Sequence, residues 1–455
     1  MRVLFVRPKP SPETIGLQHV MIVEPLELEV LATLIQAEHE VRIVDLILEK
    51  KELVYFLKEF VPQAVCVTGY ITHIPVMIEC CHEAKLFNDN IITIVGGVHI
   101  EKFPDDIEHQ AVDYRVIRNA TRTFPQLISF LAQKADFPQG VLRKNEIVIS
   151  RNLPDYDFYF PIPDRSLTQK YRGKYFYVFH DKVALVKTSF GCPYHCKFCY
   201  CRKITDDHYF TRPLEEVIEE LSGIREKEIY IVDDDFLVSR NRVAEFIRLL
   251  KENNISKKYL IYGRADFIVC NPDVIKDFRE VGLRTVIVGL ESFNDQELSG
   301  FHKESDSNIN MQAMAVLNQN KVDCYAAVIV SPSWSENDFR KAGDVMLELG
   351  IKFVNLQPLT PLRGTGIEID DRNLIIPRDE YAKWDLAHVT IRPEKMSVTD
   401  YYRNIMKLYQ RIILNPKTLL RHAKYPLYLQ LRMMVGVKKV QQQYRNKIME
   451  TGKDA

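Results

Sequence analysis

Short apolar runs alternate with amphipathic segments along most of the chain. In residues 1–135 the runs are rich in β-branched side chains, which is typical of parallel strands buried on both faces. The segments between them carry apolar residues at helical spacing. The predicted strands are Val3–Val6, Val41–Val44, Ala64–Val67, Ile91–Val95 and Tyr114–Ile117, and the predicted helices are Leu26–Gln36, Lys51–Phe60, Val76–Leu86 and Phe124–Ala132. This alternation predicts an α/β domain with a doubly wound, Rossmann-like sheet.

A second alternating region covers residues 181–370. Its predicted strands are Ala184–Thr188, Glu228–Val232, Tyr259–Gly263, Thr285–Gly289, Cys324–Val330 and Phe353–Leu356. Six strand–helix units alternate here, and active sites of parallel barrels lie at the carboxyl ends of the strands. Residues 136–180 are rich in proline and aromatic side chains and predict a linker. Residues 371–455 predict a mostly helical C-terminal region.

Charge is balanced overall but not along the chain. Lys plus Arg equals Asp plus Glu, at 61 each, whereas residues 401–455 hold 12 basic and 2 acidic residues. This basic tail predicts that the C-terminal region lies near an anionic surface. Two roles are open for it: packing over the barrel mouth, or peripheral contact with a membrane. No apolar run of about 18 residues exists, so no transmembrane segment is expected.

The nine cysteines are an odd number, and we see no secretory leader. Both features predict a reducing, cytoplasmic location. Three cysteines lie at C-x3-C-x2-C spacing, in the stretch Gly191-Cys192-Pro193-Tyr194-His195-Cys196-Lys197-Phe198-Cys199-Tyr200. Three thiolates can hold three irons of a four-iron cluster, whereas most electron-transfer clusters have four cysteines. The fourth iron would be an open coordination position. A zinc loop completed by His195 or Cys201 is the alternative.

This stretch resembles the C-x3-C-x-aromatic-C motif of the radical S-adenosylmethionine (radical SAM) superfamily, with Phe198 at the aromatic position. The resemblance implies one [4Fe-4S] cluster on Cys192, Cys196 and Cys199, and a partial (β/α)6 barrel over residues 181–370. In that family the fourth iron binds the amino and carboxylate groups of SAM. One electron, from a donor such as flavodoxin or ferredoxin, then releases a 5′-deoxyadenosyl radical.

Polar residues follow the first four predicted barrel strands, where the resemblance implies SAM binding. A carboxylate among Asp233, Asp234 and Asp235 would hold the ammonium group, and Arg264 would pair with the SAM carboxylate. Glu291 or Ser292 would bind the ribose, and Phe198 would flank adenine. The alternative for three successive aspartates is a solvated turn or helix cap. The turn at 330–334 departs from the glycine-rich turn of many relatives.

The N-terminal domain resembles that of the cobalamin-binding subgroup of radical SAM enzymes, and the likeness spans roughly residues 1–370. Glycine-containing turns follow its third and fourth strands, where a ligand can approach the backbone. The implied cobalamin-binding residues are Gly69, Tyr70, Thr72, His73, Gly96, Gly97, Val98 and His99. The D-x-H-x-x-G motif of cobalamin-dependent mutases is absent, which leaves His73 as a candidate lower-face ligand. In relatives an acidic turn follows the fifth strand of this domain. In this chain residues 118–122 take its place and are not acidic.

These features predict a cobalamin-dependent radical SAM methyltransferase that acts on an unactivated carbon of a small-molecule or lipid-like substrate. A radical oxidative cyclase or rearrangement enzyme with the same cofactors is the alternative. A non-catalytic cobalamin-binding regulator would not need the cysteine loop. A tRNA methylthiotransferase needs a second cluster, but Cys66, Cys80 and Cys81 are placed as buried residues of a strand and a helix. No nucleic-acid partner is expected.

Overall fold

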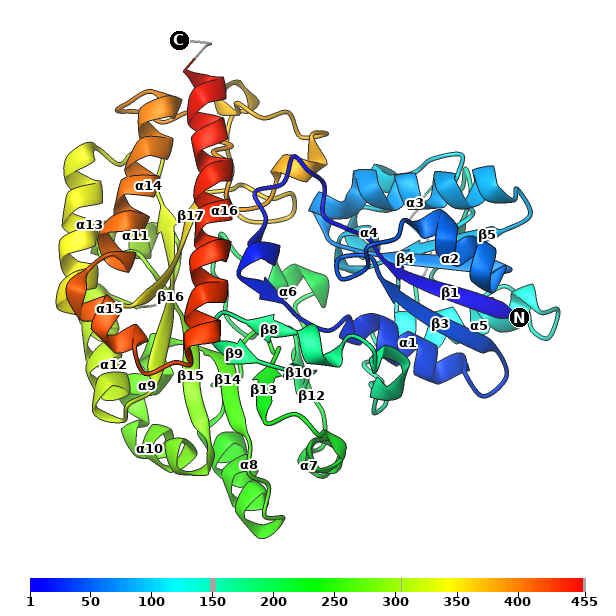
Figure 1. Cartoon of the computed structure of the whole chain (residues 1–455), viewed down its shortest axis with the longest axis horizontal. Coiled ribbons are helices and arrows are strands. Elements are labelled where there is room, and N and C mark those ends of the chain that lie inside the picture. The colour runs from blue at the N-terminus through cyan, green and yellow to red at the C-terminus, as the bar shows by residue number, and fades with distance from the viewer. Residues whose placement is uncertain (148–152, 304, 453–455) are drawn as a thin grey trace. The chain divides into compact units, whose positions relative to one another are not determined.

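The computed structural model describes residues 1–147, 153–303 and 305–452 (Figure 1). Contacts divide the chain into two compact units. The first contains Met1–Thr14, Glu24–Lys174 and Arg378–Asp385, and the second contains Ile15–Val23, Tyr175–Pro377 and Leu386–Ala455. Most of the predicted linker therefore belongs to the first unit, and a short N-terminal segment belongs to the second.

A six-stranded sheet of order β3-β1-β4-β5-β6-β7 forms the centre of the first unit. The strands are β1 (Arg2–Arg7), β3 (Glu40–Asp45), β4 (Ala64–Thr68), β5 (Ile92–Gly96), β6 (Tyr114–Val116) and β7 (Val141–Arg143). The first five pair in parallel, as predicted. The short strand β7 was not predicted, and it pairs antiparallel with β6.

Helices cover both faces of this sheet. They are α1 (Leu26–Ile35), α2 (Leu53–Phe60), α3 (Ile74–Phe87), α4 (Val98–Lys102) and α5 (Ala120–Leu131). Side chains of β1 alternate between the two layers, since Leu4 and Val6 pack with α2 and α3 while Val3 and Phe5 pack with α1 and α5. This alternation is the expected result of a strand buried on both faces, and it confirms the doubly wound prediction.

The second unit contains six parallel strands in sequential order. They are β10 (Val183–Val186), β13 (Glu228–Ile231), β14 (Lys258–Gly263), β15 (Leu283–Glu291), β16 (Asp323–Val330) and β17 (Phe353–Pro358). The helices between them are α6 (Cys201–Ile204), α7 (Leu214–Gly223), α8 (Arg240–Glu252), α9 (Ala265–Cys270), α10 (Pro272–Val281), α11 (Asp295–Gly300), α12 (Ser307–Gln319) and α13 (Glu336–Glu348). This arrangement confirms the predicted partial barrel.

Two small antiparallel sheets accompany the barrel. Strands β2 (Met21–Ile22), β8 (Phe176–Tyr177) and β9 (His180–Asp181) form one, and β11 (Ser189–Phe190) and β12 (Phe210–Thr211) form the other. The Tyr177 ring lies 5.0 Å from the ring of Tyr230 on β13 and 6.1 Å from that of Tyr325 on β16. Aromatic rings from three strands therefore pack together in the second unit.

The C-terminal helices α14 (Val398–Ile413), α15 (Pro416–His422) and α16 (Leu427–Thr451) have different environments. The apolar face of α14 belongs to the barrel core, and its Tyr401 hydroxyl donates to the Val330 carbonyl at 2.8 Å. The helix therefore packs against the barrel beside β16 and β17. In contrast, most of α16 is exposed or half-buried. None of the helices in the described ranges is both long and apolar enough to cross a membrane.

Candidate active site

The three predicted cluster cysteines lie in the loop that follows the first barrel strand. The hairpin of β11 and β12 closes the base of this loop. Gly191 begins the loop with φ of 76°, and a Cβ atom there would lie 2.2 Å from the His208 carbonyl oxygen. Only glycine fits both the left-handed backbone and this close approach. The loop is held from outside by Lys197, whose N–H donates to the Phe301 carbonyl and whose carbonyl accepts from Gly366 N–H.

The thiols of this loop are half-buried and close to one another. Burial raises the pKa of Cys192 to about 12 and also raises the pKa of Cys196. A hydrogen bond from Cys201 lowers the pKa of Cys199. Among the described residues, no three Cys, His, Asp or Glu side chains converge on one metal ion. A four-iron cluster would take one thiolate on each of three irons, which is the arrangement that the resemblance implies for Cys192, Cys196 and Cys199.

The three successive aspartates after β13 have different partners. Asp233 is buried and accepts hydrogen bonds from the backbone and hydroxyl groups of Thr188 and Ser189. Asp234 accepts from Gly191 N–H at 3.1 Å. These two carboxylates fix the end of β10 and the start of the cysteine loop. Both carboxylates already accept hydrogen bonds from the protein. A direct contact of either one with SAM stays a prediction.

Asp235 is the aspartate whose hydrogen-bonding capacity is incompletely used. Its Oδ1 accepts from Leu237 N–H at 2.9 Å, whereas its Oδ2 is buried and has no hydrogen-bond partner in the described chain. Burial raises the pKa of this carboxyl group to about 7, against the opposing effect of Arg264 and Lys303. A buried carboxylate oxygen without a donor is the environment that a ligand ammonium group would satisfy.

Arg264 follows β14 and is held by several protein groups. Its guanidinium donates to both carboxylate oxygens of Asp266 and to the Lys303 carbonyl at 2.8 Å, and its Nη1 lies 3.8 Å from Cys196 Sγ. The guanidinium also lies 3.8 Å from the ring centre of Tyr194. Arg264 therefore links the cysteine loop to the segment that carries Lys303. Its pairing with the SAM carboxylate stays a prediction.

Glu291 forms a buried ion pair that the sequence did not indicate. Its Oε1 lies 3.2 Å from Lys303 Nζ, and both side chains are more than nine-tenths buried. A Cβ atom at Gly289 would lie 2.2 Å from Glu291 Oε1 and 3.0 Å from Lys303 Nζ, so the glycine makes room for the pair. Glu291 itself has φ of 59°, next to a register shift between β15 and β16. Backbone strain of this kind is concentrated at functional sites.

The remaining predicted SAM residues have defined contacts. Ser292 Oγ donates to the Glu297 carboxylate, which also accepts from Trp334 Nε1 at 2.8 Å. The Ser292 hydroxyl is thus engaged at the fourth strand end, and Glu297 and Trp334 were not predicted there. The Phe198 ring packs edge-on against Phe301, with ring centres 5.5 Å apart. Phe198 therefore joins the cysteine loop to the segment that carries Lys303.

In the first unit, the predicted cobalamin residues gather at the carboxyl ends of β4 and β5. Gly97 has φ of 122°, and a Cβ atom there would lie 2.5 Å from the Gly69 carbonyl oxygen. The two turns therefore touch through their backbones. Val98 begins α4, whereas the side chain of Tyr70 is 66% exposed. A glycine-lined edge with an exposed aromatic side chain fits a large planar ligand.

The two histidines at this edge are constrained by neighbours. His99 is buried, and its Nε2 lies 2.8 Å from Asp106 Oδ2. His73 Nδ1 accepts from Tyr70 N–H at 3.4 Å and lies 3.3 Å from Thr72 Oγ1. Burial lowers the pKa of His73 to about 4, so its ring is neutral near pH 7. An Nδ1 that accepts places the single proton on Nε2, which makes Nε2 a donor.

Comparison with known proteins gives two domain matches. Residues 186–346 match the radical SAM superfamily, and residues 14–128 match the B12 binding domain. The chain is a radical SAM enzyme with a B12-binding domain. The resemblance seen in the cysteine loop and in the glycine turns is thereby confirmed. The enzyme's cofactors are a [4Fe-4S] cluster, SAM and cobalamin.

Relatives of the enzyme include methylases and cyclases. It is 26% identical to the hopanoid C-3 methylase of Methylococcus capsulatus over 423 residues, which cover 90% of this chain and 80% of that protein. It is 24% identical to the anaerobic magnesium-protoporphyrin IX monomethyl ester cyclase of Synechocystis, over 68% of this chain and 63% of that protein. The structure of the methyltransferase TsrM from Kitasatospora setae has a TM-score of 0.67 at 16% identity, covering 91% of this chain and 89% of that one. At this identity the structural likeness establishes the fold.

Proposed function

We propose that the enzyme transfers a methyl group from SAM to an unactivated carbon of a small-molecule or lipid-like substrate. The observation that carries this proposal is the set of groups at the carboxyl ends of the barrel strands. There Arg264 links Cys196 of the cysteine loop to Lys303 of the Glu291–Lys303 pair, and Asp235 presents an unsatisfied carboxylate oxygen. The B12-binding domain in the same chain supports a cobalamin-dependent reaction, and the methylases among the relatives support methyl transfer.

The chain's own residues would bind and orient SAM. Cys192, Cys196 and Cys199 would hold the cluster, which when bound supplies the electron that cleaves SAM. Asp235 would accept the ammonium group of SAM, and this contact would stabilise the ionised carboxylate. The pair of Glu291 and Lys303 would offer one acceptor and one donor to the ribose or the carboxylate.

The glycine turns of the first unit would bind cobalamin, which when bound carries the methyl group to be transferred. Gly69, Gly96 and Gly97 would let the corrin approach the backbone, and Tyr70 would pack on its face. His73 would contribute an Nε2–H donor in the tautomer that its contacts favour. A strong histidine ligand to cobalt is therefore not part of this proposal.

The substrate class is inferred from the relatives. The methylases among them are named for hopanoids, which supports a lipid-like substrate. The cyclase relatives keep oxidative cyclisation open as the second candidate. We further propose a flavodoxin or ferredoxin as the electron donor. All nine cysteines are free, which supports a reducing, cytoplasmic location.

The products of turnover distinguish the two candidates. The reconstituted enzyme would be incubated with SAM, a reductant and lipid extract, and the products would be quantified by mass spectrometry. Methyl transfer predicts one S-adenosylhomocysteine and one 5′-deoxyadenosine for each methylated product. Formation of 5′-deoxyadenosine without S-adenosylhomocysteine and without an added methyl group would refute methyl transfer and favour cyclisation.

A further inference from the structure

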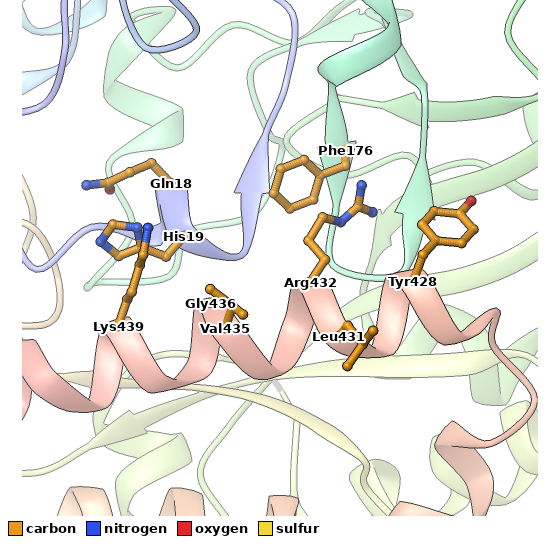
Figure 2. A pocket seen from close by; sticks show the side chains of 9 residues that line it. All are labelled: Gln18, His19, Phe176, Tyr428, Leu431, Arg432, Val435, Gly436 and Lys439. Atoms are coloured by element: carbon orange, nitrogen blue, oxygen red, sulfur yellow. The ribbon is translucent and has the colours of Figure 1, made fainter. Parts of the chain in front are cut away.

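The exposed side of α16 forms an open groove in the second unit that the proposed reaction does not use. Figure 2 shows α16 along one side of the groove, opposite Gln18, His19 and Phe176. The groove has a volume of about 480 Å³. Its base is fixed by Gly436, where a Cβ atom would lie 2.1 Å from the His19 carbonyl oxygen. The helix and the 3₁₀ turn η1 (Leu17–His19) are therefore in direct backbone contact, and the groove is a built feature.

Apolar side chains border this groove and face solvent. Leu427, Leu431, Met434 and Val435 of α16 are each more than half exposed, and Leu17 of η1 is 43% exposed. Positions 427, 431, 434 and 435 share one side of a helix, because residues three and four apart are neighbours. Contiguous exposed apolar side chains are rare on monomeric soluble proteins and mark an interaction surface.

The charge of the same region is one-sided. Residues 401–449 contain eleven Lys and Arg and no Asp or Glu. Lys438 and Lys439 are exposed, and neither forms an ion pair with the part of the chain that the structure describes. Burial, followed by the nearby charge of Lys439, lowers the pKa of His19, so that this histidine is neutral near pH 7. The free positive charge at the groove therefore comes from the lysines.

A second cation forms the wall of the groove. Arg432 Nη1 donates to Asp181 at 2.7 Å, and the guanidinium lies 4.0 Å from the ring centre of Phe176. Its Nε and Nη2 atoms are buried and have no hydrogen-bond partner in the described residues. The groove thus has a guanidinium in its wall, beside an apolar rim and free lysines. This combination is complementary to an anionic headgroup joined to apolar chains.

We propose that this groove and the apolar rim of α16 dock on an anionic lipid bilayer. Leu427, Leu431 and Val435 would enter the headgroup–acyl boundary, while Lys438 and Lys439 would pair with lipid phosphates. The groove would receive one headgroup between Arg432 and Lys439. Charge favours this occupant, because a second copy of the chain would bring two basic faces together. The proposal does not depend on the nature of the radical reaction.

The test is co-sedimentation of the reconstituted full-length protein with vesicles. One set contains equimolar phosphatidylglycerol and phosphatidylcholine, and the other contains phosphatidylcholine alone. Each lysine near an anionic bilayer changes partitioning about fivefold, so Lys438→Gln with Lys439→Gln should weaken binding to the anionic vesicles by roughly 30-fold. Leu431→Ser with Val435→Ser should also weaken it. Leu86→Ser with Lys50→Glu, exposed positions in the first unit, is the matched control and should bind as the wild type does.

The outcomes separate this proposal from other occupants of the groove. Unchanged binding in both groove variants, or equal binding to the two vesicle types, would overturn it. A second copy of the chain is the occupant if two results come together. The wild type would fail to bind anionic vesicles, and analytical ultracentrifugation would show dimers that the Leu431→Ser and Val435→Ser variant loses.

Inorganic phosphate should not release the protein from vesicles at matched ionic strength. If it does, a free anion rather than a bilayer is the ligand. Iron content and unfolding temperature confirm that each variant is folded.

Discussion

Replacement of Asp235 by asparagine tests the electrostatic description of the SAM site. In the folded protein without cofactors, burial raises the pKa of Asp235 from 3.8 to about 7. Each pH unit between these values corresponds to about 1.4 kcal/mol, so ionisation of the buried carboxyl group costs about 4 kcal/mol. Asparagine has a similar shape and no charge, and its oxygen can still accept from Leu237 N–H.

The sign of the pH effect follows from proton binding. Between about pH 4 and pH 7 the folded protein holds a proton on Asp235 that the unfolded chain has lost, so wild-type stability falls as the pH rises. At pH 4 the variant and the wild type should therefore be equally stable. Above about pH 7 the variant should be the more stable by up to about 4 kcal/mol, with no further change in the difference.

Urea unfolding of the cofactor-free protein from pH 4 to pH 8 measures this difference. Asp277→Asn, which replaces an exposed carboxylate on α10, is the control and should show no such pH dependence. A stability difference that does not change with pH, or an Asp235→Asn variant that is less stable at every pH, would refute the reasoning. The same variant should bind SAM at least tenfold more weakly, because it cannot neutralise the ammonium group.

Three further predictions concern other parts of the two sites. Gly97→Ala should destabilise the first unit by about 1–3 kcal/mol and abolish cobalamin uptake in an optical titration, because its φ and its contact with Gly69 exclude a side chain. Gly96→Ala is its control and should change stability by less than about 1 kcal/mol, since its nearest neighbour would be 3.6 Å away. Lys303→Met should cost about 3–5 kcal/mol in chemical unfolding by leaving Glu291 buried and unpaired, and adding Glu291→Gln should recover most of this loss. A double variant as unstable as the sum of the single ones would show that the two side chains do not interact. Replacing Cys192, Cys196 and Cys199 together by alanine should remove the cluster iron, whereas Cys270→Ala and Cys324→Ala should retain it.

The strands of both sheets could be predicted because each is an apolar run flanked by helical periodicity. Strands β2, β7, β8, β9, β11 and β12 were missed, since two or three residues are too few to show a period. The assignment of Ile15–Val23 to the second unit depends on contacts with α16 that are distant in sequence. Local patterns do not contain such information.

In the candidate site, too, the sequence reveals local features but not contacts between distant segments. The cysteine spacing identified the cluster loop, because that information is local. The three aspartates are alike in sequence, and only their partners in the fold distinguish the anchoring role of Asp233 from the unsatisfied oxygen of Asp235. Lys303 was missed because it follows a short helix and belongs to no motif that sequence analysis used. Its position beside Glu291 is fixed by the room that Gly289 provides.

Electron paramagnetic resonance of the reduced cluster tests the central claim most directly. The claim is that the loop of Cys192, Cys196 and Cys199 holds one cluster whose open iron binds SAM. Addition of SAM labelled with ¹⁵N at its amino group should shift the spectrum of the reduced wild-type protein and give a ¹⁵N hyperfine coupling. An unchanged spectrum and no ¹⁵N coupling, in a protein that carries its full cluster iron, would contradict the account.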